Sequence, residues 1–432
     1  MKKLTGILLA VIYAAGGMTV YAQQISGTEG AQQKSDTYTV YAPQTEEIAE
    51  QIAYVPVEAA SAAAIVNSDS FVDRTADQSN FDLPCKAALL MDENTGQILY
   101  AKNADQQLPI ASITKVMTML LVFEAVDSGK IKMQDTVPIS AHAYSMGGSQ
   151  IWLEPGEIFT VHELLKAVAV SSANDAAVAL AEFVGGSESV FCDMMNTRAK
   201  ELGMENTNFV NACGLDAPGH LSTANDVAIM SRQLMKHEKV FEYTTIWMDY
   251  LRDGQTQLVN TNKMLHSYTG TTGLKTGTTN GAGVCITATA KRQDLSLIAV
   301  VLGSPSGEER FAAAKKLLDF GFSNFESKMF PSIEDYPQNI AVRHGVQKTV
   351  PLEYNLPKKL LFLKGASSKL ESRITLPRYI DAPVDKGTAV GTVDLYSQGQ
   401  KIKEYSVTIG ENAEKITFKK AFEILLRAAA TC

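Results

Sequence analysis

The sequence predicts an α/β fold, in which an antiparallel sheet is flanked by helices and joined to a helical subdomain, followed by a small all-β domain. Two observations lead to this fold class. Apolar strand segments stand both before and after a block of segments with helical periodicity, which indicates a layered domain. Beyond about residue 330, short alternating segments are separated by Pro, Gly and Asp, which is typical of an all-β domain.

Length and composition exclude several classes of protein. The chain has 432 residues, enough for two or three domains, and 45% of them are hydrophobic. The formal net charge of −8 and the lack of a basic patch argue against a nucleic-acid partner. The five cysteines form no CxxC pair, and the six histidines show no HExxH spacing. We therefore expect no metal site and no cofactor.

The first 22 residues have the pattern of a secretory signal peptide. Lys2 and Lys3 form a basic start, residues 8–15 an apolar centre, and residues 20–22 a small-residue cleavage site. A transmembrane anchor is the alternative, but two glycines interrupt a run that is already too short to span a bilayer. The sequence thus predicts an exported, extracytoplasmic protein.

Residues 23–82 are rich in Gln, Ser, Thr, Ala and Glu and contain few aromatic residues. This composition predicts a low-complexity tether, with one weak helix near residues 46–53. The tether leads into the predicted α/β domain, which covers residues 83–328.

The elements of the α/β domain follow from periodicity and turn residues. A strand over 87–92 and a partner over 97–101 enclose the turn Glu93–Gly96, and a helix beginning at Ser112 ends near Gly129. Further helices are predicted over 161–184, with a polar break at 171–175, over 188–202, from after residues 222–226 to about residue 237, and over 308–320. Between the last two, residues 275–279 open onto two apolar segments, 283–290 and 295–303, and we expect these to be paired strands of an antiparallel sheet.

The predicted all-β domain covers residues 329–411, and an amphipathic helix covers 412–432. At helical spacing, Phe418, Phe422 and Leu425 fall on one side of this last segment, and basic residues dominate the other. The functional interpretation is an in-plane anchor at the outer face of the cytoplasmic membrane. The alternative is a helix that docks onto the protein's own surface.

One stretch in the first predicted helix indicates chemistry. Ser112 and Lys115 are three residues apart, so they share a helix face, and the apolar run after them indicates burial. A serine beside a desolvated lysine at a helix N-terminus is an activated nucleophile. Taken alone, the pair fits better a serine that caps a core helix and a lysine that reaches solvent.

Two later motifs favour the catalytic interpretation. Ser172 and Asn174 stand at the break between two apolar helices, and Lys275-Thr276-Gly277 opens a strand that precedes glycine-rich sequence. Ser-x-x-Lys, Ser-x-Asn and Lys-Thr-Gly in this order are the signature of penicillin-recognising serine enzymes. Each motif also stands in the expected local context.

From residue 87 to residue 325 the chain resembles the low-molecular-mass penicillin-binding proteins, the serine-type D-Ala-D-Ala carboxypeptidases. Besides the three motifs, the resemblance rests on residues 91–96, 153–157, 172–176, 214–220 and 273–277. It implies a β-lactamase/transpeptidase-like fold, peptidoglycan stem peptides as substrates, and β-lactam antibiotics as covalent inhibitors. The all-β domain and the terminal helix fit the same layout.

The resemblance also implies roles for the motif residues. Ser112 would attack the carbonyl between the last two D-alanines, and Lys115 would accept the serine proton. Ser172 would relay a proton to the leaving amine, with Lys275 polarising its hydroxyl.

The remaining residues would bind the substrate. Asn174 would bind a peptide amide or orient Lys115. The backbone amides of Ser112 and Thr278 would form the oxyanion hole. The terminal carboxylate would lie against the strand that carries Lys275-Thr276-Gly277, with Thr276, Thr278 and Arg310 beside it. For Arg310 the alternative is an arginine on a helix surface that is exposed to solvent and has no role in binding.

Two departures from the family pattern narrow the function. Thr278 stands where some members carry histidine, and no Glu-x-x-Leu-Asn follows Ser172, since Glu205–Asn208 lacks the leucine. Without a glutamate to activate a deacylating water, we expect long-lived β-lactam acyl-enzymes. A β-lactamase or a DD-endopeptidase on the same scaffold, and a non-catalytic wall-binding protein, are the alternatives to the carboxypeptidase.

Overall fold

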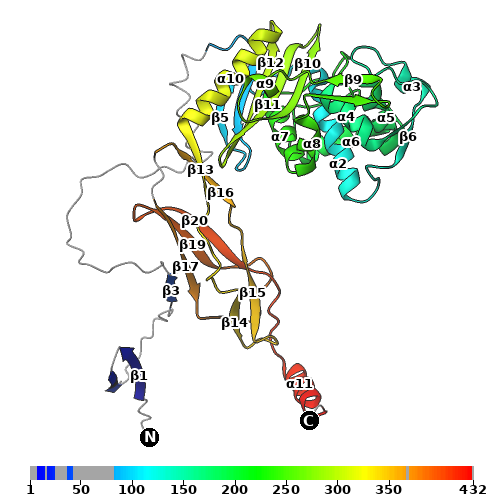
Figure 1. Ribbon diagram of the computed structural model, residues 1–432. Helices are drawn as coiled ribbons and strands as arrows, with labels where there is room; N and C mark the ends of the chain where they lie inside the picture. Colours follow the sequence, from blue (N-terminus) through cyan, green and yellow to red (C-terminus); the bar gives the residue numbers. More distant parts are fainter. Residues whose placement is uncertain (1–6, 15–16, 25–36, 42–81, 366–368, 431–432) are drawn as a thin grey trace.

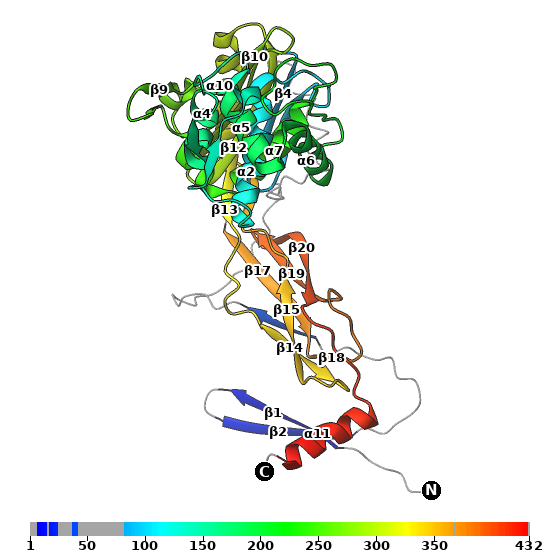
Figure 2. The ribbon, with the colours of Figure 1, turned by 90° about the vertical axis from the view of Figure 1, so that its right-hand side faces the viewer.

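The computed structural model describes residues 7–14, 17–24, 37–41, 82–365 and 369–430. The α/β domain and the β domain are stacked end to end, and the terminal helix lies at the end of the β domain far from the α/β domain (Figures 1 and 2). The predicted fold class, with an α/β domain followed by an all-β domain, is confirmed.

The α/β domain is built on a five-stranded antiparallel sheet in the order β10-β11-β12-β4-β5. Its strands are β4 (Ala87–Asp92), β5 (Ile98–Lys102), β10 (Thr271–Thr279), β11 (Gly283–Arg292) and β12 (Leu295–Ser304). All five were predicted, four of them from apolar segments and β10 as the strand that carries Lys275-Thr276-Gly277. The order places β10 at an edge of the sheet, so one row of its backbone N–H and C=O groups faces no neighbouring strand.

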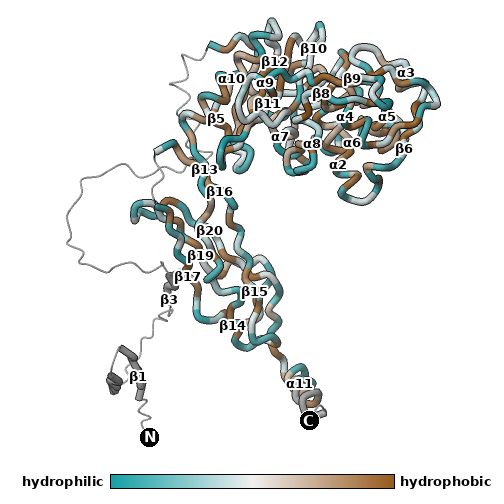
Figure 3. Tube along the Cα trace, in the orientation of Figure 1, coloured by the Kyte–Doolittle hydropathy of each residue, from teal (hydrophilic) through white to brown (hydrophobic). Residues whose placement is uncertain are grey.

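Both faces of this sheet are covered, which explains why its central strand is apolar throughout. In β12, Ile298, Val300 and Leu302 pack into the helical core, whereas Leu297 and Val301 pack against α10 (Gly307–Asn324) on the other face. A strand buried on both sides reads as a continuous hydrophobic run rather than as alternation. Figure 3 shows the contrast with β20 (Gln400–Ile409), where polar and apolar residues mix.

The helical subdomain surrounds one central helix. In α2 (Lys115–Asp127) nearly every residue is buried, as expected for a helix packed on all sides. Around it lie α4 (Val161–Val170), α5 (Asn174–Gly185), α6 (Glu188–Glu201) and α7 (Ala224–Met235). The predicted break at 171–175 is the loop between α4 and α5. A capping box of Thr160 and Glu163 fixes the start of α4.

Short elements within this domain escaped the sequence analysis. They are β6 (Thr136–Pro138), α3 (Ala141–Tyr144), β7 (Ile158–Thr160), α8 (Phe241–Thr244), β8 (Met248–Leu251), β9 (Thr256–Val259) and α9 (Met264–Ser267). Segments of three or four residues are too short for a helical or strand period to be read from the sequence.

The β domain contains a seven-stranded sheet in the order β18-β14-β15-β20-β19-β17-β3, and β13 pairs with β16. The strands are β13 (Phe325–Met329), β14 (Asn339–Arg343), β15 (Thr349–Tyr354), β16 (Lys359–Leu363), β17 (Leu370–Pro377), β18 (Tyr379–Asp381), β19 (Ala389–Ser397) and β20. The alternating segments predicted from the sequence correspond to β15, β16, β17, β19 and β20.

The N-terminal segments differ in part from the prediction. β1 (Ile7–Ala14) pairs with β2 (Gly17–Gln24), and the signal peptide stays a prediction. β3 (Thr37–Tyr41) pairs with β17, although the sequence analysis assigned no strand to the tether. Its Thr, Tyr and Val residues favour an extended conformation. The weak helix predicted near residues 46–53 lies outside the described residues.

The terminal helix, α11 (Phe418–Ala430), starts six residues later than predicted, because residues 412–417 form the end of the β domain instead. Phe418, Phe422 and Leu426 lie on its exposed surface at a spacing of four residues. In the described ranges of the chain, no helix has both the length and the hydropathy needed to cross a bilayer.

Candidate active site

Ser112 lies in a 3₁₀ turn, Ala111–Thr114, that runs directly into α2. The turn is packed against two glycines. A Cβ atom on Gly277 would come 2.8 Å from the Ser112 amide nitrogen, and one on Gly214, where φ is +87°, would collide with the Ala111 carbonyl. Ala111 itself has φ of 49°, in the left-handed region. Only glycine at positions 214 and 277 therefore allows the backbone to pack this closely against the Ser112 turn.

Lys115 follows Ser112 by one turn and is fully buried. Its Nζ atom lies 2.9 Å from Ser112 Oγ, 2.6 Å from Asn174 Oδ1 and 2.7 Å from the Cys213 carbonyl oxygen. Burial lowers the pKa of Lys115 to about 8, against the opposing effect of Asp175. The predicted Ser112–Lys115 neighbourhood is therefore formed, and the amine is partly neutral near physiological pH.

Asn174 orients the lysine. Its Nδ2 atom donates to the Gly147 carbonyl at 2.6 Å, so the amide oxygen faces Lys115. The next residue, Asp175, accepts hydrogen bonds from the backbone N–H groups of Ile151 and Leu153 at 3.1 Å each. These bonds hold the loop 147–153 against the start of α5. Of the two roles that the resemblance implied for Asn174, the geometry supports orientation of Lys115.

Ser172 lies in the α4–α5 loop with φ of 62°, in the left-handed region that non-glycine residues rarely adopt. The expected bond between Lys275 and its hydroxyl is not formed. Lys275 Nζ donates instead to the Thr276 carbonyl at 3.0 Å. Lys115 also makes no bond to Ser172, because its three close partners already use the capacity of the amine.

The opposite wall of the site is the edge strand β10. It carries Lys275 and Thr276, both buried, and Thr278, which is exposed. Burial lowers the pKa of Lys275 well below its usual value, and the positive charges of Lys115 and Arg310 lower it further. A bound anion would reverse this shift.

Arg310, from α10, reaches the same strand. Its Nη1 atom lies 3.3 Å from the Gly277 carbonyl and 3.5 Å from Thr278 Oγ1, and its Nε–H has no partner. It forms no ion pair with a carboxylate within the ranges that the structure describes. A buried guanidinium with unused donors beside an edge strand is suited to bind a carboxylate. Arg310 is therefore not a solvated helix arginine.

The structure adds residues that sequence reasoning missed. Thr261 donates its N–H to the Val170 carbonyl and places its hydroxyl 2.6 Å from Thr276 Oγ1, so it links the loop before Ser172 to β10. His220 contacts Thr114 Oγ1 at 2.7 Å, beneath the Ser112 turn. The resemblance covered residues 214–220, which was the available signal for His220; no sequence signal marked Thr261.

Glu205, considered above as a deacylating acid, is exposed. No cluster of His, Cys, Asp and Glu side chains suited to a metal ion occurs among the residues described. The site brings together Ser112, Lys115, Ser172, Asn174, Lys275, Thr276, Gly277, Thr278 and Arg310 around β10 and the starts of α2 and α5. This arrangement, a serine beside a buried lysine and facing a cationic edge strand, defines a serine acyl-transfer enzyme.

Comparisons with known proteins identify the family. The family model for D-alanyl-D-alanine carboxypeptidase, peptidase S11, matches residues 73–306, and the model for the C-terminal domain of penicillin-binding protein 5 matches residues 325–415. The chain is 44% identical over 342 residues to D-alanyl-D-alanine carboxypeptidase DacF of Bacillus subtilis, which covers 78% of this chain and 88% of that protein.

Solved structures of penicillin-binding proteins are also similar to this chain. Penicillin-binding protein 5 of Haemophilus influenzae matches with a TM-score of 0.68 and 30% identity, over 78% of this chain and 99% of that one. Penicillin-binding protein D2 of Listeria monocytogenes, in its cefotaxime-bound form, matches with a TM-score of 0.53 and 36% identity, over 57% of this chain and all of that one (100%). The chain belongs to the peptidase S11 family and is a serine-type D-Ala-D-Ala carboxypeptidase.

Proposed function

We propose that this carboxypeptidase removes the terminal D-alanine from peptidoglycan stem pentapeptides through an acyl-enzyme on Ser112. Ser112 Oγ attacks the carbonyl carbon between the last two D-alanines while Lys115 takes the hydroxyl proton. The tetrahedral intermediate then expels the terminal D-alanine, and water hydrolyses the ester that remains. The same serine opens the ring of a β-lactam and stays acylated.

The proton count at Lys115 is the observation that carries this proposal. A neutral amine has two N–H bonds and one lone pair. Asn174 Oδ1 and the Cys213 carbonyl can only accept, so they take the two N–H bonds. The lone pair is left for the third neighbour, Ser112 Oγ, at 2.9 Å. Neutral Lys115 is thereby oriented as a base toward the nucleophile and toward no other group.

The sheet side would bind the substrate. The amides of Ser112 and Thr278 are suited to stabilise the oxyanion, because Thr278 lies on the free edge of β10 beside the Ser112 turn. Arg310, Lys275 and the Thr276 hydroxyl would hold the terminal carboxylate. Ser172, on the facing loop, would pass a proton to the departing amine, and substrate binding would bring Lys275 to its hydroxyl.

Export and membrane attachment are part of the same proposal. The signal-like residues 1–22 support secretion, and peptidoglycan lies outside the cytoplasmic membrane. The exposed Phe418, Phe422 and Leu426 of α11 support in-plane attachment to the outer face of that membrane. The alternative, docking of α11 on the protein's own surface, is disfavoured by the 90% exposure of Phe418.

A labelling experiment tests the catalytic proposal. The full-length protein is incubated with a fluorescent penicillin and run on a denaturing gel, and a defined pentapeptide is analysed by mass spectrometry. We expect a covalent label and loss of one alanine, both abolished by Ser112→Ala and both retained by Ser145→Ala, a change at an exposed serine. A label that survives Ser112→Ala, or an unchanged peptide with wild type, would contradict the proposal.

The scaffold alternatives are tested in the same samples. A DD-endopeptidase would cleave cross-linked muropeptides in preference to linear pentapeptides, and a β-lactamase would release the bound penicillin within the assay. We expect the linear peptide to be preferred and the label to persist, because among the described residues no carboxylate hydrogen-bonds to Ser112 or Lys115.

A further inference from the structure

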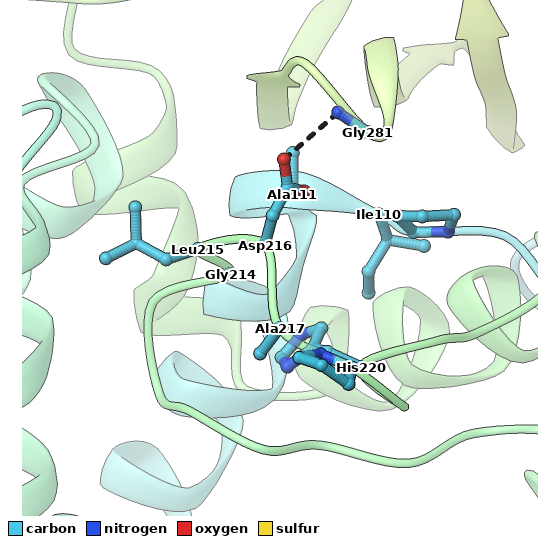
Figure 4. Close-up of a pocket in the computed structure, with 10 residues that line it drawn as sticks. Ile110, Ala111, Gly214, Leu215, Asp216, Ala217, His220 and Gly281 are labelled. Carbon is cyan, nitrogen blue, oxygen red and sulfur yellow. Dashed lines mark hydrogen bonds between the residues drawn. The ribbon is translucent and has the colours of Figure 1, made fainter.

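A cavity of about 270 Å³ opens beside the Ser112 turn (Figure 4). One wall is Pro109–Ala111, immediately before the nucleophile, and the other is the loop Gly214–Pro218. Gly281, from the turn between β10 and β11, lines the same space. Most of the lining is apolar, and Asp216 and His220 are the titratable residues in it.

Asp216 places a negative charge at this cavity. Its carboxylate accepts hydrogen bonds from Thr279 Oγ1 at 2.6 Å and from the Gly281 N–H at 3.0 Å, as Figure 4 shows for Gly281. The side chain is exposed, and no cation pairs with it in the part of the chain that the structure describes. Each carboxylate oxygen keeps a lone pair for a further donor.

His220 does not neutralise that charge. Its Nδ1 atom accepts the Val210 N–H at 3.1 Å, so the ring proton is on Nε2 and is donated to Thr114 Oγ1 at 2.7 Å. Burial lowers the pKa of His220 to about 4. The ring is therefore neutral, and Asp216 carries the only charge of the cavity lining.

The direction of a bound substrate connects this cavity to the reaction. The proposed terminal carboxylate lies at Thr276 and Arg310, and the reacting carbonyl lies at Thr278, two residues further along β10. A peptide held along this edge advances about 3.3 Å per residue. The third residue of the stem, which precedes the penultimate D-alanine, then lies opposite Thr279–Gly281. Asp216 accepts its two hydrogen bonds from this segment.

We propose that the cavity is the subsite for the side chain of the third stem residue, and that Asp216 selects a side chain that ends in an ammonium group, as in a diamino acid. This inference rests on the proposed function. The apolar walls of Ile110, Ala111 and Leu215 suit the aliphatic part of such a side chain. The open lone pairs of Asp216 suit its charged end, since charge-assisted hydrogen bonds are the stronger class.

Two pentapeptides test the inference. One carries L-lysine at the third position and the other Nε-acetyl-lysine, which has the same chain without the charge. With the full-length wild-type protein we expect kcat/KM for D-alanine release to be about tenfold higher for the lysine peptide. In Asp216→Asn we expect the two values to be equal within about twofold.

Asp216→Asn removes the charge but can keep both hydrogen bonds that Asp216 forms with Thr279 and Gly281. Its amide oxygen can accept the Gly281 N–H, and its NH₂ group can donate to Thr279 Oγ1, which already accepts the Ala282 N–H. The ratio between the two peptides is measured within one variant, so a general loss of activity cannot imitate a loss of selectivity. Asp253→Asn removes the same charge from an exposed turn outside the cavity and should keep the tenfold ratio.

The outcomes separate the inference from the function on which it rests. Equal release from both peptides by wild type, or an unchanged ratio in Asp216→Asn, would overturn the subsite and leave the carboxypeptidase intact. Release from neither peptide by wild type would overturn both. Loss of the ratio in Asp253→Asn as well would show a general charge effect and would also overturn the assignment to Asp216.

Discussion

The two sides of the active site are built differently. On the helical side, the amine of Lys115 is surrounded by neutral oxygen atoms of Ser112, Asn174 and Cys213, all within 2.9 Å. On the sheet side, burial lowers the pKa of both Lys275 and Arg310, the charge of Arg310 lowers the pKa of Lys275 further, and no carboxylate pairs with either among the described residues.

This difference assigns a task to each side. A buried amine among neutral acceptors is stabilised in its uncharged form and can take a proton. Two buried cations without an anion are stabilised when an anion arrives. The helical side is therefore arranged for proton transfer and the sheet side for recognition of a carboxylate, and changes on each side should affect different steps.

The largest effect should follow from removing the base. Lys115→Gln leaves Ser112 without a proton acceptor, and we expect the rate of acylation by a β-lactam to fall about 10³-fold. Stopped-flow or gel-based acylation kinetics measure this. The matched control is Lys166→Gln, which alters a lysine of α4 that forms an ion pair with Asp249 of β8. This variant should change the rate less than twofold. A small effect of Lys115→Gln on the acylation rate would show that the helical side does not supply the base.

A smaller effect is expected on the sheet side. Arg310→Gln should lower kcat/KM for a peptide with a free C-terminal carboxylate roughly 100-fold, because a charge-assisted contact is lost. For the same peptide ending in an amide, the variant and wild type should differ little. Arg343→Gln, in the β domain, removes an exposed ion pair with Asp381 and serves as control. Equal losses on both peptides would place Arg310 in the chemistry rather than in carboxylate binding.

The smallest effect should be the pH dependence of the acylation rate, which we expect to follow the titration of Lys115 on the helical side. Because burial lowers the pKa of Lys115 to about 8, only about a tenth of the protein carries the neutral base at pH 7. The acylation rate at saturating β-lactam should therefore rise about tenfold from pH 7 to pH 9 and then level off. Lys115→Gln should lose this rise. A rate that falls as pH increases through 8 would mean that the protonated amine is the active form.

Much of this site could be predicted because its contacts are local. The three-residue spacing of Ser112 and Lys115 already implies that they meet on one face of a helix. The strand with Lys275 was evident from the apolar segments that follow it. Both predictions depend on neighbours in the sequence, for which periodicity is a sufficient guide.

The parts that could not be predicted depend on distant contacts or on backbone atoms. The Cys213 carbonyl accepts from Lys115 across 98 positions in sequence, and any residue type could provide such a carbonyl. Thr261 meets Thr276 through a segment with no motif. Ser172 has a left-handed backbone, with φ of 62°, and Lys275 donates to the Thr276 carbonyl rather than to the Ser172 hydroxyl. None of these leaves a period or a spacing in the sequence.

The two glycines that back the nucleophile also limit how the enzyme could evolve resistance to β-lactams. A methyl group at Gly277 would press on the Ser112 amide, and one at Gly214 would collide with the Ala111 carbonyl. That amide serves the antibiotic and the natural peptide alike in the proposed mechanism. Variation that slows acylation by the antibiotic but spares the natural reaction is therefore expected at positions that do not contact the Ser112 turn.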